Sequence, residues 1–307
     1  MLIAHVSRLR AALYVPTGAR AIPHAMAMLM LFFAAACSPL TTFNTLAPKD
    51  KASAPAERAI AYGTDARQKL DVYPAGPRDG AAPVVVFIYG GGWNNGRRQD
   101  YSFAGRALAA QGYLTIVPDY RLVPQVHFPT FLEDSAAATA WAQANAARLG
   151  GDPRQIYLIG HSAGAYNAAM IALDARYLRA AGGDPANISG VIGLAGPYDF
   201  LPFDPGAAQN AFGQAPEPAQ TQPINFVRAD APPMLLLHGA EDKVVRIRNS
   251  TSLGEKLNAI GAKADVKIYS GADHPDLVLA LSKPLRKRAP VLADINAFIA
   301  AQTPPRP

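Results

Sequence analysis

The chain alternates apolar runs with helix-like patterns from about residue 60 to its C-terminal end. The apolar runs lack the strict alternation of a half-exposed strand, which indicates that both of their faces are buried. We expect strands in KLDVYPA (69–75) and at 83–89, 113–120, 155–160, 188–196, 233–239 and 264–271. Buried strands separated by helices predict an α/β fold with a mostly parallel central sheet that helices cover on both faces.

Helical patterns lie between these strands. We expect helices at 101–112, 131–150, about 163–177, 248–261 and 291–302. The segment 200–232 differs from them, because it is rich in Pro, Gln and Ala and has no clear periodicity. Such a length is unusual for a simple connection, so we expect a functional loop over a site.

An apolar run of 12 residues, Ala25–Ala36, precedes the single cysteine of the chain, Cys37. The run is short for a transmembrane span, and Arg8, Arg10 and Arg20 lie upstream of it, as is typical of a signal peptide. The small residues before Cys37 resemble a bacterial lipobox, whose cysteine is lipidated. We expect an exported protein, periplasmic or in the cell envelope, with a lipid anchor on Cys37. The alternative is ordinary cleavage that leaves a free thiol.

The sequence divides into three expected regions. Residues 1–37 form the signal peptide, and residues 38–58 form a flexible tether that is rich in Ser, Thr, Ala, Pro and Lys. Residues 59–302 form one globular α/β domain. Half of all residues are apolar and 17% are charged, which predicts a packed core rather than disorder.

The net charge of +6 changes this picture little. Three of the positive charges belong to the N-terminal arginines, and the only dense basic run is KPLRKR at 283–288. A nucleic-acid groove needs basic residues spread along a face with aromatic platforms, so we expect no nucleic-acid partner. The chain also lacks a Cys/His cluster, an H-E-x-x-H motif and a phosphate-binding P-loop, so we expect no metal and no organic cofactor.

The sharpest chemical signal is GHSAG, Gly160 to Gly164, between an expected strand and an expected helix. This is the context of the G-x-S-x-G nucleophile elbow, in which a tight turn lifts a serine hydroxyl above the sheet. The helix that follows points free N–H groups at the same place. We therefore expect Ser162 to be a nucleophile.

A serine nucleophile needs a base, and the base needs an acid that orients it. His274 lies in a loop after the last expected strand, whereas His238 ends a strand and is expected to be a packed or hydrogen-bonded residue. Asp242 follows a strand and precedes His274, with Glu241 beside it as the alternative acid. The chain order Ser162, Asp242, His274 is that of the α/β-hydrolase class.

Several motifs together resemble the α/β-hydrolases of the esterase/lipase group, the relatives of hormone-sensitive lipase and the BD-FAE-like carboxylesterases. They are KLDVYP, FIYGGGWNNG, PDYRLVP, GGDPRQIYLIGHSAGA, HGAEDKVV and GADH, and the resemblance covers about residues 60–301. It implies the α/β-hydrolase fold and a serine carboxylesterase that hydrolyses short- to medium-chain esters through an acyl-enzyme. Relatives with a helical cap often carry a long N-terminal extension, so the short tether here implies no large cap domain and an open pocket.

The resemblance also implies the oxyanion hole. In these esterases the loop after the third strand of the sheet carries His-Gly-Gly-Gly, which maps onto YGGG at 89–92. Backbone N–H groups of Gly90 and Gly91, with that of Ala163 after the nucleophile, would bind the negative oxygen of the tetrahedral intermediate. Tyr89 replaces the histidine that usually braces this loop.

Other features of the pocket and of its chemistry stay open. Trp93, Tyr198 and Phe200 are candidates for the substrate-binding wall, with packing as the alternative for each. The expected partner is a small-molecule ester. Alternative functions with the same triad are an arylformamidase or other amidase and a hydrolase like the prenylcysteine methylesterases. A non-catalytic binding module on the same fold is a third alternative.

Overall fold

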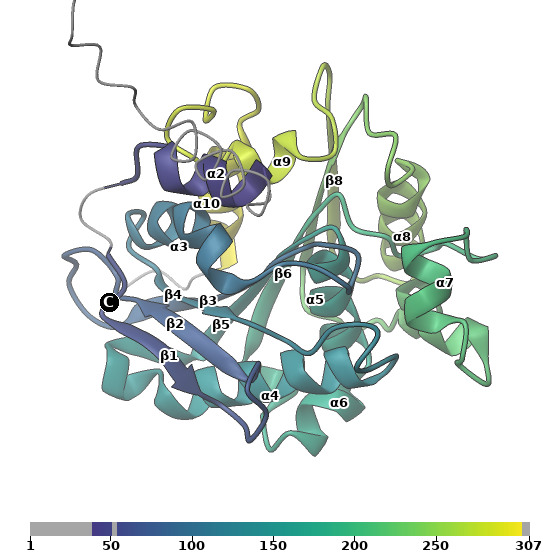
Figure 1. The fold of residues 1–307 in the computed structure, drawn as a ribbon, viewed down its shortest axis with the longest axis horizontal. Helices are drawn as coiled ribbons and strands as arrows, with labels where there is room; N and C mark the ends of the chain where they lie inside the picture. Colours follow the sequence, from purple (N-terminus) through teal and green to yellow (C-terminus); the bar gives the residue numbers. More distant parts are fainter. Residues whose placement is uncertain (1–38, 51–53, 303–307) are drawn as a thin grey trace, which may run out of the picture. The chain divides into compact units, whose positions relative to one another are not determined.

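The computed structural model in Figure 1 describes residues 39–50 and 54–302. The expected signal peptide, including Cys37, lies outside the described residues. No helix in the described residues is long and apolar enough to cross a membrane.

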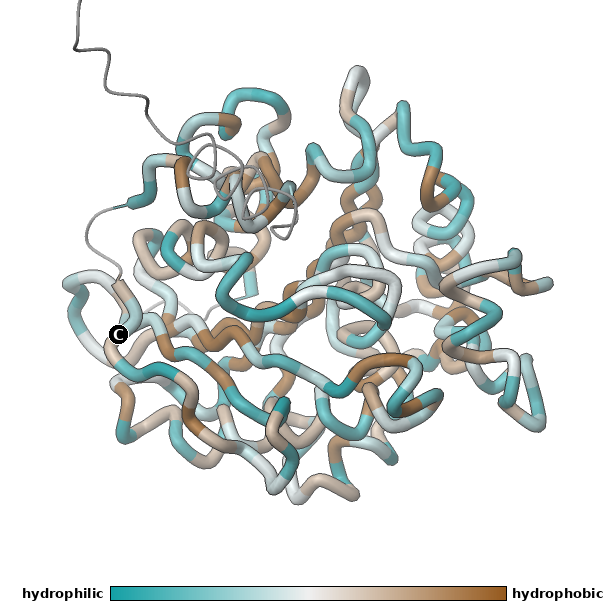
Figure 2. Tube along the Cα trace, viewed as in Figure 1, coloured by the Kyte–Doolittle hydropathy of each residue, from teal (hydrophilic) through white to brown (hydrophobic). Residues whose placement is uncertain are grey.

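One eight-stranded sheet forms the centre of the domain, in the order β1-β2-β4-β3-β5-β6-β7-β8. Its strands are β1 (Glu57–Ala61), β2 (Lys69–Tyr73), β3 (Ala82–Ile88), β4 (Leu114–Pro118), β5 (Gly151–His161), β6 (Ile188–Leu194), β7 (Met234–Gly239) and β8 (Ala264–Tyr269). In this order, all strands from β4 through β3 to β8 are parallel to their neighbours in that run. The strand β2 is antiparallel to both of its neighbours, β1 and β4. Every residue of β3 and β7 is buried, and Figure 2 shows the hydrophobic centre that such strands form. The mostly parallel α/β fold is therefore confirmed.

Helices cover both faces of this sheet (Figure 1). The α-helices are α2 (Pro39–Leu46), α3 (Ser102–Ala109), α4 (Thr130–Asn145), α5 (Ala163–Leu173), α6 (Ala175–Ala180), α7 (Ala207–Phe212), α8 (Arg248–Ala259), α9 (Asp276–Leu279) and α10 (Val291–Gln302). Short 3₁₀ turns lie at Arg98–Tyr101, Ala147–Leu149, Pro185–Asn187, Pro218–Thr221 and Pro223–Phe226. The helices α3 and α10 share one face, where Tyr113 after α3 donates to Asn296 of α10 at 2.9 Å. The helices α4 and α5 pack together on the other face.

Besides shifts of element ends, the main differences from the sequence expectations lie at three places. The helix expected at 163–177 is two helices, because Asp174 leaves the helical conformation and its carboxylate accepts from the Arg176 N–H at the start of α6. Pro39–Leu46, inside the expected tether, is helical, and the ring of Phe43 packs edge-on against Phe103 at 5.5 Å. The expected strands also omitted β1, a short and partly exposed edge strand.

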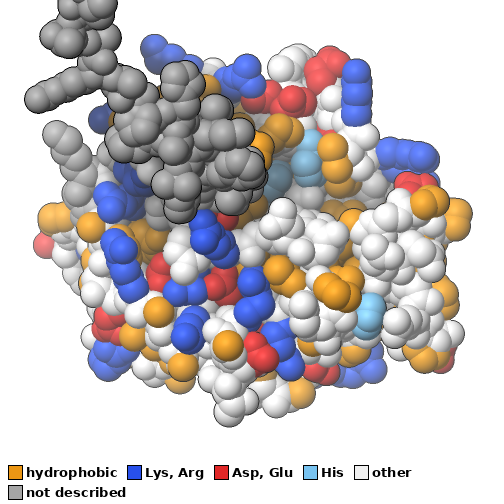
Figure 3. Space-filling view, in the orientation of Figure 1, with side chains coloured by type: hydrophobic (Ala, Val, Ile, Leu, Met, Phe, Trp, Pro, Cys, Tyr) orange, Lys and Arg blue, Asp and Glu red, His pale blue; other side chains and the backbone are white. Residues whose placement is uncertain are grey.

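The segment 200–232 joins β6 to β7 by α7 and two 3₁₀ turns, and no larger element is inserted there. On the face shown in Figure 3, Lys and Arg side chains are interspersed with acidic and apolar ones. The four loops that matter for the site follow β3, β5, β7 and β8. These parallel strands end at the same edge of the sheet, so the loops meet there.

Candidate active site

Ser162 occupies a strained turn between β5 and α5. Its backbone angles are φ 53° and ψ −122°, a conformation that is rare for a residue with a side chain. The flanking glycines leave the room that this turn needs. A Cβ on Gly160 would collide with the carbonyl group of Gly164, and a Cβ on Gly164 would collide with the carbonyl oxygen of Ile88 in β3. The G-x-S-x-G spacing therefore folds here as the elbow that the sequence predicts.

His274 and Asp242 lie in the loops after β8 and β7. The Nδ1 atom of His274 is 2.7 Å from the Oδ2 atom of Asp242, so the imidazole donates its Nδ1–H to the carboxylate and keeps Nε2 free to accept a proton. The alternative acid, Glu241, is exposed, and its backbone N–H is bound by the carbonyl oxygen of Ala272. The structure thus pairs His274 with Asp242.

Four donors surround the carboxylate of Asp242, whose side chain is completely buried. Oδ1 accepts from the backbone N–H groups of Val244 and Val245 at 2.8 and 2.9 Å. Oδ2 lies 2.7 Å from His274 and 3.2 Å from Nε2 of His238. Burial alone would raise the pKa of Asp242, but the hydrogen bonds from His238, His274 and Val245 outweigh it and hold the pKa well below its ordinary value. Asp242 therefore stays ionised.

His238 is the packed, hydrogen-bonded strand-end residue that the sequence predicts, but its contact with Asp242 was not expected. It is fully buried at the end of β7, with Nε2 2.9 Å from the carbonyl oxygen of Val245 and Nδ1 2.8 Å from the hydroxyl of Ser250. Because the Val245 carbonyl can only accept, Nε2 carries the proton and also faces Asp242. The four-residue spacing between His238 and Asp242 was the one available signal for this contact.

His161 connects the elbow to the loop that carries His274. Its Nε2–H donates to the carbonyl oxygen of His274 at 3.1 Å, and the two imidazole rings lie 4.8 Å apart. Burial, reinforced by the nearby His274, lowers the pKa of His161 to about 3. His161 is therefore neutral at ordinary pH and adds no positive charge beside His274. These contacts place His274 next to the residue that precedes Ser162.

The glycine loop after β3 approaches Ser162 from the other side. A Cβ on Gly90 would lie 3.0 Å from the Cβ of Ser162 and 2.8 Å from the carbonyl oxygen of His161, so only glycine leaves this space open. Gly91 has φ 123°, and its carbonyl oxygen accepts from the backbone N–H groups of Asn94 and Asn95. Ala163 is the first residue of α5, where backbone N–H groups have no partner within the helix.

Tyr89 braces this loop through three polar contacts. Its hydroxyl donates to Asp119 at 2.9 Å and accepts from Arg67 at 2.9 Å, and its carbonyl oxygen accepts from the hydroxyl of Tyr120 at 3.0 Å. The same Arg67 group donates to the carbonyl oxygen of Gly96 at 2.9 Å. Tyr89 thus ties the start of the loop to its end, in place of the expected histidine.

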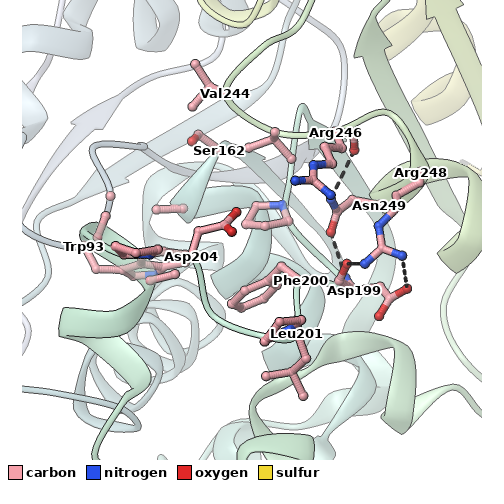
Figure 4. A pocket seen from close by; sticks show the side chains of 18 of the residues that line it. Trp93, Ser162, Asp199, Phe200, Leu201, Asp204, Val244, Arg246, Arg248 and Asn249 are labelled. Carbon is pink, nitrogen blue, oxygen red and sulfur yellow. Dashed lines mark hydrogen bonds and ion pairs between the residues drawn. The ribbon is translucent and has the colours of Figure 1, made fainter.

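A cavity of about 550 Å³ opens beside Ser162 (Figure 4). Its wall includes Gly92, Ala163, Trp93 and Phe200, together with residues of the 199–208 and 243–249 segments. Tyr198, in contrast, is fully buried and does not line the cavity, because its ring fills the space beside Gly193 and Gly196. Tyr198 is therefore a packing residue, and its expected place in the substrate wall was wrong.

Trp93 belongs to an aromatic cluster behind this wall. Its indole ring packs against Tyr166 at 5.4 Å and Phe212 at 4.8 Å, and only 4% of the residue's surface is exposed. The indole N–H donates to Asn167 at 3.1 Å. Trp93 also has φ 59°, a left-handed conformation that a bulky residue rarely adopts. The cluster fixes the far end of the glycine loop.

Two curated proteins that are similar to this chain are esterases by name. The isoprenylcysteine alpha-carbonyl methylesterase ICME of Arabidopsis thaliana is 32% identical over 75% of this chain and 58% of its own length. Esterase LipC of Mycobacterium tuberculosis is 34% identical over 66% of this chain and 55% of its own length. The chain thus spans between half and two thirds of the length of these relatives.

Solved structures agree on the fold. Esterase B from Lactobacillus rhamnosis superposes with a TM-score of 0.76 at 21% identity, over 91% of this chain and 96% of that chain. A truncated carbohydrate esterase from gut microbiota superposes with a TM-score of 0.72 at 22% identity, over 83% of this chain and 99% of that chain. The BD-FAE family profile matches residues 70–257, which include the glycine loop, the elbow and Asp242. The chain therefore belongs to the BD-FAE family of α/β-hydrolases.

Proposed function

We propose that this protein is a serine carboxylesterase that hydrolyses short- to medium-chain esters. The observation that carries the proposal is the meeting of three loops at Ser162. The strained elbow presents the serine, the Asp242–His274 pair lies against the adjacent His161, and Gly90 approaches the Cβ of Ser162. The names of the relatives support the same reaction class.

In the proposed reaction, Nε2 of His274 takes the proton of the Ser162 hydroxyl as its oxygen attacks the ester carbonyl. The negative oxygen that forms is stabilised by the N–H groups of Gly90, Gly91 and Ala163. The intermediate collapses, and the alcohol leaves with the proton from His274. Water then attacks the acyl-enzyme and gives a proton to His274, which passes it to the departing Ser162 oxygen, so that the acid and the free serine are released. Asp242 keeps the imidazole oriented and stabilises its charged form.

The cavity supports acyl groups of modest length. Its volume of about 550 Å³ lies within the range of small-molecule sites, and Trp93 and Phe200 supply apolar wall. A panel of p-nitrophenyl esters from acetate to decanoate tests this, with Ser162→Ala in parallel. We expect the highest kcat/KM at short or medium chains and a loss of at least about 10³-fold in the variant. Background rates for the wild type, or equal rates in both proteins, would refute the proposal.

The relatives make one alternative specific enough to test beside it. A prenylcysteine methyl ester and a formyl anilide belong in the same panel, since ICME is named for the first substrate and amidase chemistry uses the same triad. If the kcat/KM for the prenylcysteine methyl ester or for the formyl anilide exceeds the kcat/KM for every simple ester, the assignment changes from carboxylesterase to methylesterase or amidase, respectively.

We also propose that the protein is exported and lipid-anchored through Cys37. The support is the sequence alone: an apolar run of 12 residues, upstream arginines and small residues before the cysteine. Metabolic labelling with a fatty-acid analogue in a bacterial host is the test. We expect label on the wild type and none on Cys37→Ser, and label that persists in the variant would contradict the anchor.

A further inference from the structure

We propose that the cavity beside Ser162 contains a carboxylate-binding subsite at Arg246, so that the preferred ester carries a carboxylate in its acyl or alcohol part. This inference rests on the proposed esterase function. It adds a charged substrate class to a reaction that otherwise requires only an apolar ester.

The first observation is the charge of the cavity wall. Three cations and two carboxylates line it, namely Lys243, Arg246, Arg248, Asp199 and Asp204. Arg248 and Asp199 form an ion pair, with the guanidinium 3.8 Å from the side-chain carboxylate. The guanidinium also donates to the backbone carbonyl oxygen of Asp199 at 3.1 Å. Within the described residues, the side chains of Lys243 and Arg246 make no ion pair. Arg246 therefore has all five of its N–H donors available to a ligand.

The second observation is that the backbone below Arg246 is fixed in advance. Asn249, only 4% exposed, donates to the carbonyl oxygen of Arg246 at 3.1 Å. The side-chain amide oxygen of Asn249, Oδ1, accepts from the backbone N–H groups of Tyr198 and Asp199, each at 2.8 Å. One buried amide thus joins the two segments that form this wall. Figure 4 shows Arg246 on the same cavity as Ser162, above Asn249.

The competing charges of the site do not neutralise Arg246. The triad carboxylate of Asp242 is completely buried and already has four donors. Asp204 also lines the cavity, but it forms no ion pair with Arg246. Arg248 and Asp199 cancel one another's charge. The remaining charged side chains of the wall are Lys243, Arg246 and Asp204, whose sum is one net positive charge. Such a charge matches a monoanion better than a phosphate dianion. A guanidinium binds a carboxylate through two parallel hydrogen bonds, and this supports a carboxylate as the ligand.

The test measures kcat/KM for two matched pairs of esters. Methyl hydrogen glutarate against methyl hexanoate places the carboxylate on the acyl side, and butyryl glycolate against propyl butyrate places it on the alcohol side. We expect the charged ester of at least one pair to react about fivefold faster or more at low ionic strength, with the preference falling in salt. Arg246→Gln should lower this ratio about fivefold, and Asp204→Asn should raise it about twofold.

Arg58→Gln is the matched control, because it removes the same charge from an exposed position on β1 at the far edge of the sheet. A ratio of one or less for both pairs, or a shift in Arg246→Gln no larger than in Arg58→Gln, would overturn the subsite. A separate readout needs no turnover: calorimetry with Ser162→Ala and glutaramate, a monocarboxylate amide. Binding that Arg246→Gln weakens supports the subsite, and the absence of binding contradicts it. Loss of the esterase function itself would show instead as no hydrolysis of any neutral ester.

Discussion

One carboxylate oxygen of Asp242 faces two imidazoles, and this arrangement makes His238 a candidate positioning residue. His238→Leu removes the donor at 3.2 Å and leaves the carbonyl of Val245 and the hydroxyl of Ser250 without their partner. We expect kcat to fall about tenfold, as for the loss of other groups that orient a reactive side chain. The carboxylate of Asp242 would also become more basic, because the hydrogen bond from His238 helps to lower its pKa, and the acid limb of the kcat/KM profile would move upward.

Ser250→Ala is the control for this prediction, because it removes only the contact on the far side of the His238 ring. It should lower stability by about 1 kcal/mol with little change in the pH profile. If His238→Leu is destabilised while its acid limb stays in place, His238 is a packing residue only.

The buried, neutral His161 predicts a pH dependence of stability. In the unfolded chain its pKa is about 6.5, whereas in the folded protein it is about 3, so the unfolded state binds the extra proton between these values. Stability is therefore lost as pH falls through this window. Urea unfolding at pH 7 and pH 5 should show a loss on the order of 2 kcal/mol in the wild type that is missing in His161→Gln. Equal losses in both proteins would contradict the depressed pKa.

The sequence indicated the residues of the site whose roles depend on local motifs. Ser162 follows from the elbow pattern, and Asp242 and His274 follow from their places after strands. The role of His238 could not be read in the same way, because it depends on how the 240–245 turn folds back over the end of β7. The prediction that Tyr198 lines the substrate wall was wrong for a related reason. Its sequence neighbours line the cavity, but its own side chain points into the space left by two glycines.

At the scale of elements, the loop from Tyr89 to Gly96 is held by one hydroxyl network. Tyr89→Phe removes the bonds to Asp119 and from Arg67 while the ring stays stacked on Tyr101 and Tyr120, 5.2 and 4.8 Å away. We expect a loss of stability of about 1–2 kcal/mol and a several-fold fall in kcat, because the oxyanion donors lose their support. Urea unfolding and ester hydrolysis measure the two effects.

Tyr101→Phe provides the comparison within the same aromatic stack. Its hydroxyl makes only a 3.5 Å contact with the carbonyl oxygen of Gly90, so its removal should cost clearly less in both measurements. Equal effects of the two substitutions would assign the support of the loop to ring packing instead of the hydroxyl network.

Element boundaries were predictable where the pattern is strong. The buried strands β3 and β7 match their expected ranges within one residue, because their apolar runs are bounded by Pro and Gly. The break at Asp174 was not visible, since the sequence on both sides of it suits a helix. The strand β1 was missed because its residues are partly exposed and pair only with β2, so its sequence carries little apolar pattern.

At the scale of the whole molecule, the parallel α/β architecture followed from the sequence, but the order of the strands did not. Periodicity shows which residues are buried and says nothing about which strands become neighbours. That order decides the site, since β5 lies in the middle of the sheet and carries Ser162, while β8 lies at the edge and carries His274. The base is therefore supplied by a strand with only one hydrogen-bonded neighbour.

The exposed edge of β8 is a place where copies of the chain could pair, and Lys267 opposes this. Its ammonium lies 2.7 Å from Asp294, with both charges partly exposed beside the open strand edge. Charged side chains on edge strands prevent such pairing. We therefore expect the average molecular mass of Lys267→Ile to increase with protein concentration more than that of the wild type, as measured by analytical sedimentation. Lys256→Ile makes the same change on the exposed surface of α8 and should leave the mass unchanged. If both variants associate equally, surface hydrophobicity is the cause, and the charge on β8 has no special role.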